Sequence, residues 1–367
     1  MARKNEYITK THPKTLIIGI EAPYNKTVNM DSYFQEFVNL VKTNGTEYDE
    51  AVFIKLRDID PGYFLTKGKL QEVKELVDKH EIKEVIISEP LTVQQERNLN
   101  DFLRCKIHDR TRLILEIFEK SAHTSEGKIQ VAIAMLQFDK SRLAGQGIYL
   151  SQQAGTIGNR GPGETLKERE TRHIENAVIK LKRNLIILEK ARATQRKRRL
   201  NSKLPLICLV GYTNAGKSTI LNALTKSNVL AEDKLFATLD TTTRELYVDG
   251  QKKGLISDTV GFIQQLPHQL IEAFKSTLSE LQYADLLLHV IDAADPNWEN
   301  HIKVVMAILH ELKVDKPMLY VFNKADKVAD TQALEQQIAH YEPHVIVSAQ
   351  SKTGLKPLYE FLKTWQR

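Results

Sequence analysis

A strand, a glycine-rich loop and a helix follow one another after residue 205, and this unit constrains the fold more than any other feature. Leu206-Ile-Cys-Leu-Val210 has the composition of a buried strand. It runs into Gly211-Tyr-Thr-Asn-Ala-Gly-Lys-Ser218, a complete G-x-x-x-x-G-K-[ST] motif, and Thr219–Leu224 has a helical pattern. This context predicts a phosphate-binding P-loop, in which Lys217 reaches the β and γ oxygens and the Ser218 hydroxyl ligates Mg²⁺.

A second motif, D-x-x-G, ends the strand predicted over Gly254–Gly261. Asp258 can hold the metal through water, and the Gly261 N–H can sense a γ-phosphate. Ras-like enzymes follow this motif with a glutamine that orients the attacking water, but Phe262 holds that place here, and a phenyl ring cannot do so. We therefore expect slow intrinsic hydrolysis that a partner accelerates by supplying or ordering the missing group. Two nearby glutamines are candidates for that group or are ordinary surface residues: Gln264 and Gln265.

A third motif identifies the base. Met318–Asp326 reads as a strand that runs into N-K-x-D. The Asp326 carboxylate can accept hydrogen bonds from guanine N1 and N2, donors that adenine lacks, while Asn323 and Lys324 brace the pocket. Three motifs in this order predict binding of GTP and GDP in preference to ATP.

Composition sets the remaining bounds. The 367 residues are 42% hydrophobic and 27% charged, which favours a globular chain of two or three domains. Two cysteines are too few for a disulfide framework or a zinc ribbon, and no Cys, His and acidic residues have the spacing of another metal site. The chain lacks a signal peptide and any apolar run of about 18 residues, so we expect a cytoplasmic protein without a transmembrane segment, transient attachment to a membrane surface remaining open.

The pattern divides the chain into three parts: an N-terminal α/β domain (1–125), a helical arm (126–203) and the P-loop GTPase domain (204–367). In the first part, short apolar runs alternate with helical stretches, which predicts a small parallel sheet. The predicted strands are Thr15–Ile20, Ala51–Ile54 and Glu84–Ser88. The predicted helices between them are Met30–Thr43, Lys69–Lys79 and Thr92–Leu103.

The arm reads as two long helices joined by a glycine-rich tip, Ala154–Gly163. Its second helix has an apolar stripe at spacings of three and four residues, formed by Ile174, Val178, Leu181, Leu185 and Leu188. Thr165–Lys203 holds 13 Lys and Arg against 4 Glu, a net +9 in a chain of net +6. Such a run is either a solvated helix face or a contact for a phosphate backbone. The candidate RNA-binding residues are Arg160, Arg196, Lys197, Arg198 and Arg199.

These motifs together resemble the HflX family of ribosome-associated GTPases, within the translation-factor class. The matching segments of the GTPase domain are Gly211–Ser218, Phe236–Asp240, Asp258–Phe262, Asn323–Asp326 and Ser348–Gln350. The matching upstream segments are Pro61–Lys69, Gln95–Leu99, His108–Leu115, Glu126–Gln130 and Gly161–Thr165.

The resemblance assigns further site residues. It implies that Thr238 is the switch threonine that completes the Mg²⁺ shell, although Thr241, Thr242 and Thr243 lie close enough to be alternatives. Ser348 and Ala349 would flank the guanine. The catalytic residues are then Lys217, Thr238 and Gly261, and the metal ligands are Ser218 and Thr238. The nucleotide-binding residues are Gly211, Tyr212, Thr213, Asn214, Ala215, Gly216, Lys217, Ser218, Thr219, Phe236, Ala237, Thr238, Leu239, Asp240, Asp258, Thr259, Val260, Gly261, Asn323, Lys324, Asp326, Ser348, Ala349 and Gln350.

The resemblance also implies a partner. The N-terminal domain and the arm would dock a monomer on the large ribosomal subunit and its RNA, and GTP hydrolysis would accompany subunit dissociation of stalled or idle ribosomes. A ribosome-assembly factor acting on immature large-subunit RNA, or a switch that recruits a protein partner, would need the same GTPase residues. Asn214 holds the loop position that coordinates potassium in some related GTPases, so K⁺ is a candidate cofactor beside Mg²⁺.

Overall fold

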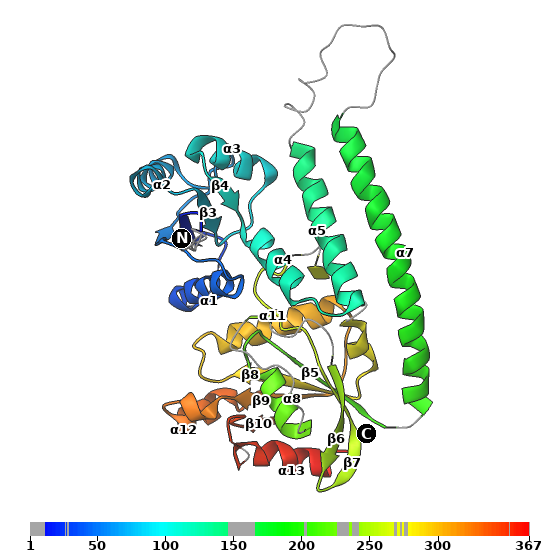
Figure 1. The fold of residues 1–367 in the computed structure, drawn as a ribbon. Coiled ribbons are helices and arrows are strands. Elements are labelled where there is room, and N and C mark those ends of the chain that lie inside the picture. The colour runs from blue at the N-terminus through cyan, green and yellow to red at the C-terminus, as the bar shows by residue number, and fades with distance from the viewer. Residues whose placement is uncertain are drawn as a thin grey trace, which may run out of the picture. The chain divides into compact units, whose positions relative to one another are not determined.

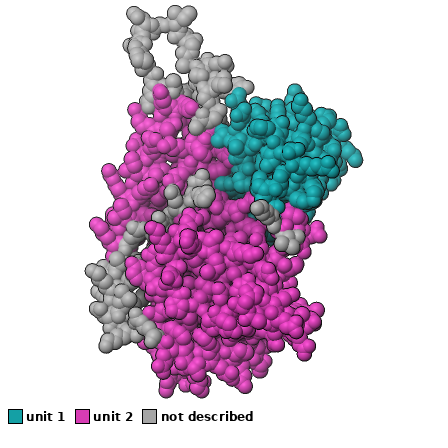
Figure 2. Space-filling model, turned by 180° about the vertical axis from the view of Figure 1, so that it is seen from behind, with its two compact units in different colours: residues 1–26, 33–114 teal, residues 27–32, 115–367 magenta. Residues whose placement is uncertain are grey.

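The computed structural model describes residues 12–25, 27, 29–145, 166–201, 204–225, 235–236, 242–267, 270–271, 274, 278–351 and 353–366 (Figure 1). The chain forms two compact units (Figure 2). One comprises Met1–Lys26 and Tyr33–Ile114, and the other comprises Thr27–Ser32 and Leu115–Arg367. The three-part division of the chain stays a prediction.

The first unit contains a four-stranded sheet that is entirely parallel, and its parallel arrangement was predicted. In the order β2-β1-β3-β4, its strands are β2 (Glu50–Lys55), β1 (Thr15–Glu21), β3 (Glu84–Ile87) and β4 (Lys106–His108). Helices lie between the strands along the chain: α1 (Met30–Thr43), α2 (Lys67–His80) and α3 (Val93–Leu103). Helix α4 (Arg110–Ser121) follows β4. The predicted helices and strands agree with these elements, but β4 was not predicted.

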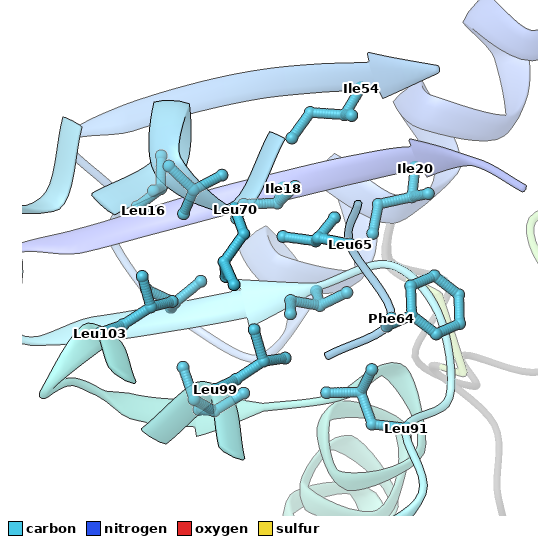
Figure 3. Packing of buried hydrophobic residues seen from close by; sticks show 14 of the residues in the cluster. Leu16, Ile18, Ile20, Ile54, Phe64, Leu65, Leu70, Leu91, Leu99 and Leu103 are labelled. Carbon is cyan, nitrogen blue, oxygen red and sulfur yellow. The ribbon is translucent and has the colours of Figure 1, made fainter. Parts of the chain in front are cut away.

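The core of this unit is built on β1, whose first six residues are all buried. Leu16, Ile18 and Ile20 point from one face of β1 into a cluster to which α3 contributes Leu99 and Leu103 (Figure 3). A continuous apolar strand of this kind is typical of the interior of a parallel sheet, where both faces are covered. Burial of each such side chain contributes about 1.5–3 kcal/mol to stability.

A buried carboxylate lies just beyond the carboxyl end of β3. Glu89 is fully buried and accepts hydrogen bonds from the Tyr24 hydroxyl at 2.5 Å and the Tyr33 hydroxyl at 2.8 Å. Burial, and secondarily the Glu89 charge, raise the pKa of Tyr24. Parallel sheets bind ligands at this edge, but a buried carboxylate repels a phosphate.

The second unit includes two long antiparallel helices, α5 (Ser125–Gly145) and α7 (Leu166–Asn201), which lie side by side (Figure 1). Lys140 of α5 pairs with Glu175 of α7 at 2.7 Å. All five residues of the predicted stripe are partly buried: Ile174, Val178, Leu181, Leu185 and Leu188. The predicted tip and Arg160 lie outside the described residues.

The GTPase part of this unit is a six-stranded sheet in the order β10-β9-β8-β5-β7-β6, with only β6 antiparallel to its neighbour. Its strands are β5 (Leu206–Gly211), β6 (Thr242–Val248), β7 (Gln251–Asp258), β8 (Leu286–Asp292), β9 (Met318–Asn323) and β10 (His344–Ile346). Its helices include α8 (Lys217–Thr225), α11 (Trp298–Glu311), α12 (Thr331–Ile338) and α13 (Lys356–Thr364). Because β5, β7, β8 and β9 are parallel, the motifs that follow them meet at one edge of the sheet.

Among the described residues, no helix is both long and apolar enough to cross a bilayer. The same residues contain no group of three or more His, Cys, Asp or Glu arranged to hold a metal ion. Cys105 and Cys208 are both buried thiols.

Candidate nucleotide site

The P-loop connects the end of β5 to the start of α8. Asn214 has a φ of 59° and Gly216 a φ of 94°, so the loop turns twice through backbone conformations that favour glycine or asparagine. At Gly211 the constraint is a close approach, because a Cβ there would lie 2.2 Å from the carbonyl oxygen of Val290 on β8. The glycines of the motif are thus required by the folded loop itself.

Lys217 is buried at the first position of α8. Its Nζ donates to the carbonyl oxygens of Tyr212 at 2.7 Å and Gly211 at 3.2 Å. Burial lowers the pKa of Lys217 to about 8, and the Asp258 charge opposes that shift only in part. The loop thus holds a desolvated cation, whose affinity for an anion is strengthened by its low-dielectric surroundings.

Ser218 and Asp258 meet at the position predicted for the metal. The Ser218 hydroxyl donates to Asp258 Oδ2 at 2.6 Å, and Asp258 Oδ1 accepts from the backbone N–H of Thr259 at 2.9 Å. A hydroxyl and a fully buried carboxylate are the hard oxygen groups that Mg²⁺ prefers. The residues present therefore fit the ion.

The D-x-x-G glycine packs directly against the P-loop. A Cβ at Gly261 would lie 2.9 Å from Thr213 Cγ2 and 3.0 Å from Lys217 Nζ. The next residue, Phe262, is 1% exposed, and its backbone pairs with the loop: its N–H donates to Gly211 O at 3.1 Å, and its carbonyl accepts from Thr213 N–H at 2.7 Å. The phenyl ring is fully buried in the interior.

Asn323 connects the two halves of the site. Its Nδ2 donates to the carbonyl oxygen of Ala215 in the P-loop at 2.9 Å, and its Oδ1 accepts from the backbone N–H of Ala349 at 3.1 Å. Asn323 is 2% exposed. One amide at the end of β9 therefore joins the phosphate loop to the segment predicted to flank the base.

The other N-K-x-D residues are fixed by neighbours that the motif does not include. Lys324 has a φ of 62°, and its Nζ pairs with Asp292 at the end of β8 at 2.7 Å. Asp326 is exposed and accepts from the Ser348 hydroxyl at 2.5 Å. This arrangement leaves the Asp326 carboxylate accessible to a base and oriented by a serine.

Replacing Gly216 with alanine is expected to lower GTP affinity at least tenfold and stability by about 1–3 kcal/mol. The new Cβ would lie 2.3 Å from Asn323 Nδ2 and would displace the amide from Ala215. Fluorescent-nucleotide binding and urea unfolding measure the two effects. Gly250→Ala is the matched control, since Gly250 has a φ of 77° but nothing within 4 Å of a Cβ. Equal loss of affinity in the two variants would contradict the role of the Asn323 contact.

The structure locates several other predicted nucleotide-binding residues without assigning them a role in binding. Thr219 lies on α8, Thr259 and Val260 are buried between Asp258 and Gly261, and Gln350 is exposed in a turn. Phe236 is buried, and its ring centroid lies 4.5 Å from that of Phe118.

The switch threonine is not located. Ala237, Thr238, Leu239, Asp240 and Thr241 lie outside the described residues. The alternatives Thr242 and Thr243 begin β6. Thr238 therefore stays a prediction.

Two residues near the site were missed by the motifs: Asp292 and His301. Asp292 is the partner of Lys324, and its signal was only its place at the end of an apolar strand. Tyr212 stacks on His301 of α11, with ring centroids 3.8 Å apart. No local sequence pattern could have indicated that pair. His289, within β8, is 1% exposed, and burial lowers its pKa to about 3, so its ring is neutral.

A mostly parallel sheet with these motifs at one edge defines a P-loop GTPase. Three family profiles match the chain: GTP-binding GTPase N-terminal (residues 31–119), GTP-binding GTPase Middle Region (121–199) and 50S ribosome-binding GTPase (206–324). GTPase HflX of Caldanaerobacter subterraneus subsp. tengcongensis is 45% identical over 329 residues, which cover 89% of this chain and 76% of that protein. GTPase HflX of Escherichia coli is 41% identical over 330 residues, covering 89% and 78%. The chain belongs to the HflX family of GTPases.

A solved structure supports the fold. The SsGBP–GDP complex is 23% identical to this chain, covers 95% of it and 97% of its own chain, and superposes with a TM-score of 0.51. This likeness concerns the fold alone.

Proposed function

We propose that this GTPase docks on the large ribosomal subunit and promotes dissociation of the subunits of stalled or idle ribosomes. Two observations support the proposal: a profile described as 50S ribosome-binding GTPase matches residues 206–324, and the N-terminal part and arm match the two other profiles. The proposal places the protein in the cytoplasm, where ribosomes are.

Within the structure, the observation that carries the ribosomal partner is the basic helix α7. It is 36 residues long and holds 12 Lys and Arg against 4 Glu, which concentrates positive charge on this one element. A cluster of this size attracts a phosphate backbone by releasing condensed counterions. RNA of the large subunit is a partner that supplies such a backbone.

In the proposed reaction, each motif has one role. Lys217 neutralises charge on the β- and γ-phosphates, the Gly261 N–H contacts the γ-phosphate, and Asp326 selects guanine. Ser218, Asp258 and the proposed Thr238 would hold Mg²⁺, which supplies charge neutralisation when bound. K⁺ beside Asn214 is a further proposed cofactor.

We also propose that intrinsic hydrolysis is slow. Water must be oriented for attack on the γ-phosphate, and the buried Phe262 ring offers no hydrogen-bonding group for this. The ribosome would supply or order the missing group.

The test is the GTP hydrolysis rate of the purified protein with and without large ribosomal subunits, with ATP as the control nucleotide. We expect a low basal rate that rises strongly only with GTP and the subunit. Sedimentation of intact ribosomes with protein and GTP then tests dissociation. A rate that the subunit leaves unchanged contradicts the partner, and binding confined to immature particles would instead favour an assembly role.

Changing four consecutive basic residues to glutamine is expected to weaken ribosome binding and flatten its salt dependence. The residues are Arg196, Lys197, Arg198 and Arg199, all within α7. Removing up to four phosphate contacts should reduce the slope of log affinity against log salt by about 3. The measurement is ribosome co-sedimentation across a salt series.

A control for general charge loss uses four exposed lysines of the GTPase part of the chain. They are Lys303, Lys313, Lys356 and Lys363, each changed to glutamine. We expect this control to bind as the unmodified protein does. An unchanged slope in the α7 variant would favour a protein partner over RNA.

A further inference from the structure

Tyr212, the second residue of the P-loop, contacts the segment that follows D-x-x-G. Its side chain is 5% exposed, and its ring is stacked on the His301 ring with a centroid distance of 3.8 Å and an interplanar angle of 11°. Its hydroxyl oxygen accepts a hydrogen bond from the backbone N–H of Gln264 at 2.9 Å. The stacked ring thus brings a hydroxyl group to the segment that follows D-x-x-G.

That hydrogen bond is the third in a row between the P-loop and the segment Phe262–Gln265. The first two join backbone to backbone, from Phe262 N–H to Gly211 O and from Thr213 N–H to Phe262 O. Of these three hydrogen bonds, only the third involves a side chain. Loss of the Tyr212 hydroxyl contact would therefore leave the two backbone hydrogen bonds in place.

The same segment carries the two glutamines that are candidates for orienting water. Gln264 Oε1 accepts from the Thr27 hydroxyl at 3.4 Å, so its carboxamide is engaged by Thr27. Gln265 has a φ of 53°, a left-handed conformation that is unfavourable for a residue with a Cβ. A residue in that conformation persists only where the surrounding contacts determine it. The Tyr212 hydroxyl makes such a contact at the preceding residue.

We propose that Tyr212 is a positioning residue for GTP hydrolysis: its hydroxyl restrains Phe262–Gln265 and keeps both glutamines from the attacking water. Activation then includes release of this one hydrogen bond. The inference rests on the proposed slow, partner-accelerated hydrolysis and adds the group that keeps the intrinsic rate low.

The test is Tyr212→Phe, which removes the hydroxyl and keeps the ring on His301. Without ribosomes, we expect kcat for GTP to rise about three- to tenfold, the factor that corresponds to loss of one hydrogen bond. The KM for GTP should stay within about twofold, because no phosphate contact changes. Hydrogen–deuterium exchange of the peptide that contains Gln264 should accelerate, a readout that reports the restraint directly.

Two further variants make the result decisive. Adding Gln264→Ala and Gln265→Ala to Tyr212→Phe should return kcat to the starting value. Tyr359→Phe is the matched control. The Tyr359 hydroxyl is partly buried and donates to the Ala223 carbonyl oxygen at 3.1 Å, elsewhere in the GTPase part of the chain. We expect that variant to leave kcat unchanged.

An unchanged or lowered kcat in Tyr212→Phe overturns the proposal, as does a rise that survives loss of both glutamines or that Tyr359→Phe reproduces. The ribosomal partner is tested separately by stimulation of the unmodified protein. Failure of that stimulation leaves the Tyr212 result standing, because the Tyr212 measurement contains no ribosomes.

Discussion

Replacing Lys217 with methionine is expected to lower GTP affinity by about a hundredfold or more, while stabilising the nucleotide-free protein at pH 7. The affinity falls because the ammonium is the proposed partner of the β- and γ-phosphates, and charged hydrogen bonds of this kind contribute about 1.5–3 kcal/mol each. Stability rises because the ammonium is buried and its pKa is lowered to about 8. Removing the buried charge increases the free energy of unfolding, and losing its two hydrogen bonds to carbonyl oxygens decreases it. We expect a net increase of about 1–2 kcal/mol.

The pH dependence gives this prediction an independent check. The folded protein releases the Lys217 proton near pH 8, whereas the unfolded chain keeps it to about 10.5. Between these values the unfolded state binds more protons, so the free energy of unfolding of the nucleotide-free protein should increase with pH. The Lys217→Met variant should lack that contribution. Urea unfolding at pH 7 and pH 9.5 measures it, and a variant less stable than the unmodified protein at pH 7 would refute the account.

Replacing Asp326 with asparagine is expected to exchange guanine specificity for xanthine specificity. An asparagine amide donates where the carboxylate accepted, so it loses the guanine N2 hydrogen bond and gains one to the carbonyl of xanthine. A site built around a hydrogen bond rejects the analogue that lacks it strongly. We expect GTP affinity to fall about a hundredfold and XTP to bind, as measured by competition among GTP, XTP and ATP.

The control for this exchange is Asp330→Asn, the same substitution four residues away. Asp330 caps α12 by accepting from the backbone N–H groups of Gln332 and Ala333, both at 3.0 Å, and asparagine caps a helix equally well. This variant should keep its preference for GTP. If Asp326→Asn also keeps that preference, Asp326 does not contact the base.

The sequence predicted the fold best where one local pattern carries both structure and chemistry. Leu206–Gly211 is apolar because β5 is central in its sheet, and the glycines after it are required by close contacts and positive φ angles. Such signals are complete within about 15 residues. The short β4, Lys106–His108, was missed because three residues with two basic side chains carry no strand pattern of their own.

The candidate site could not be completed from sequence where its contacts join distant segments. The Lys324–Asp292 pair and the Asp326–Ser348 hydrogen bond connect residues 32 and 22 positions apart. The Tyr212–His301 stack connects the P-loop to α11 across 89 positions. Which residues meet in these pairs depends on the order of the strands in the sheet. The spacing of the motifs along the chain does not predict that order.

The two hydrogen bonds of Asn323 have a consequence for how bound GDP would leave. Because one amide holds both Ala215 and Ala349, the phosphate side and the base side of the pocket are not loosened independently. A partner that draws the Ala349 segment away from β9 would pull on the P-loop without touching it. Nucleotide exchange would then be accelerated from the base side of the pocket.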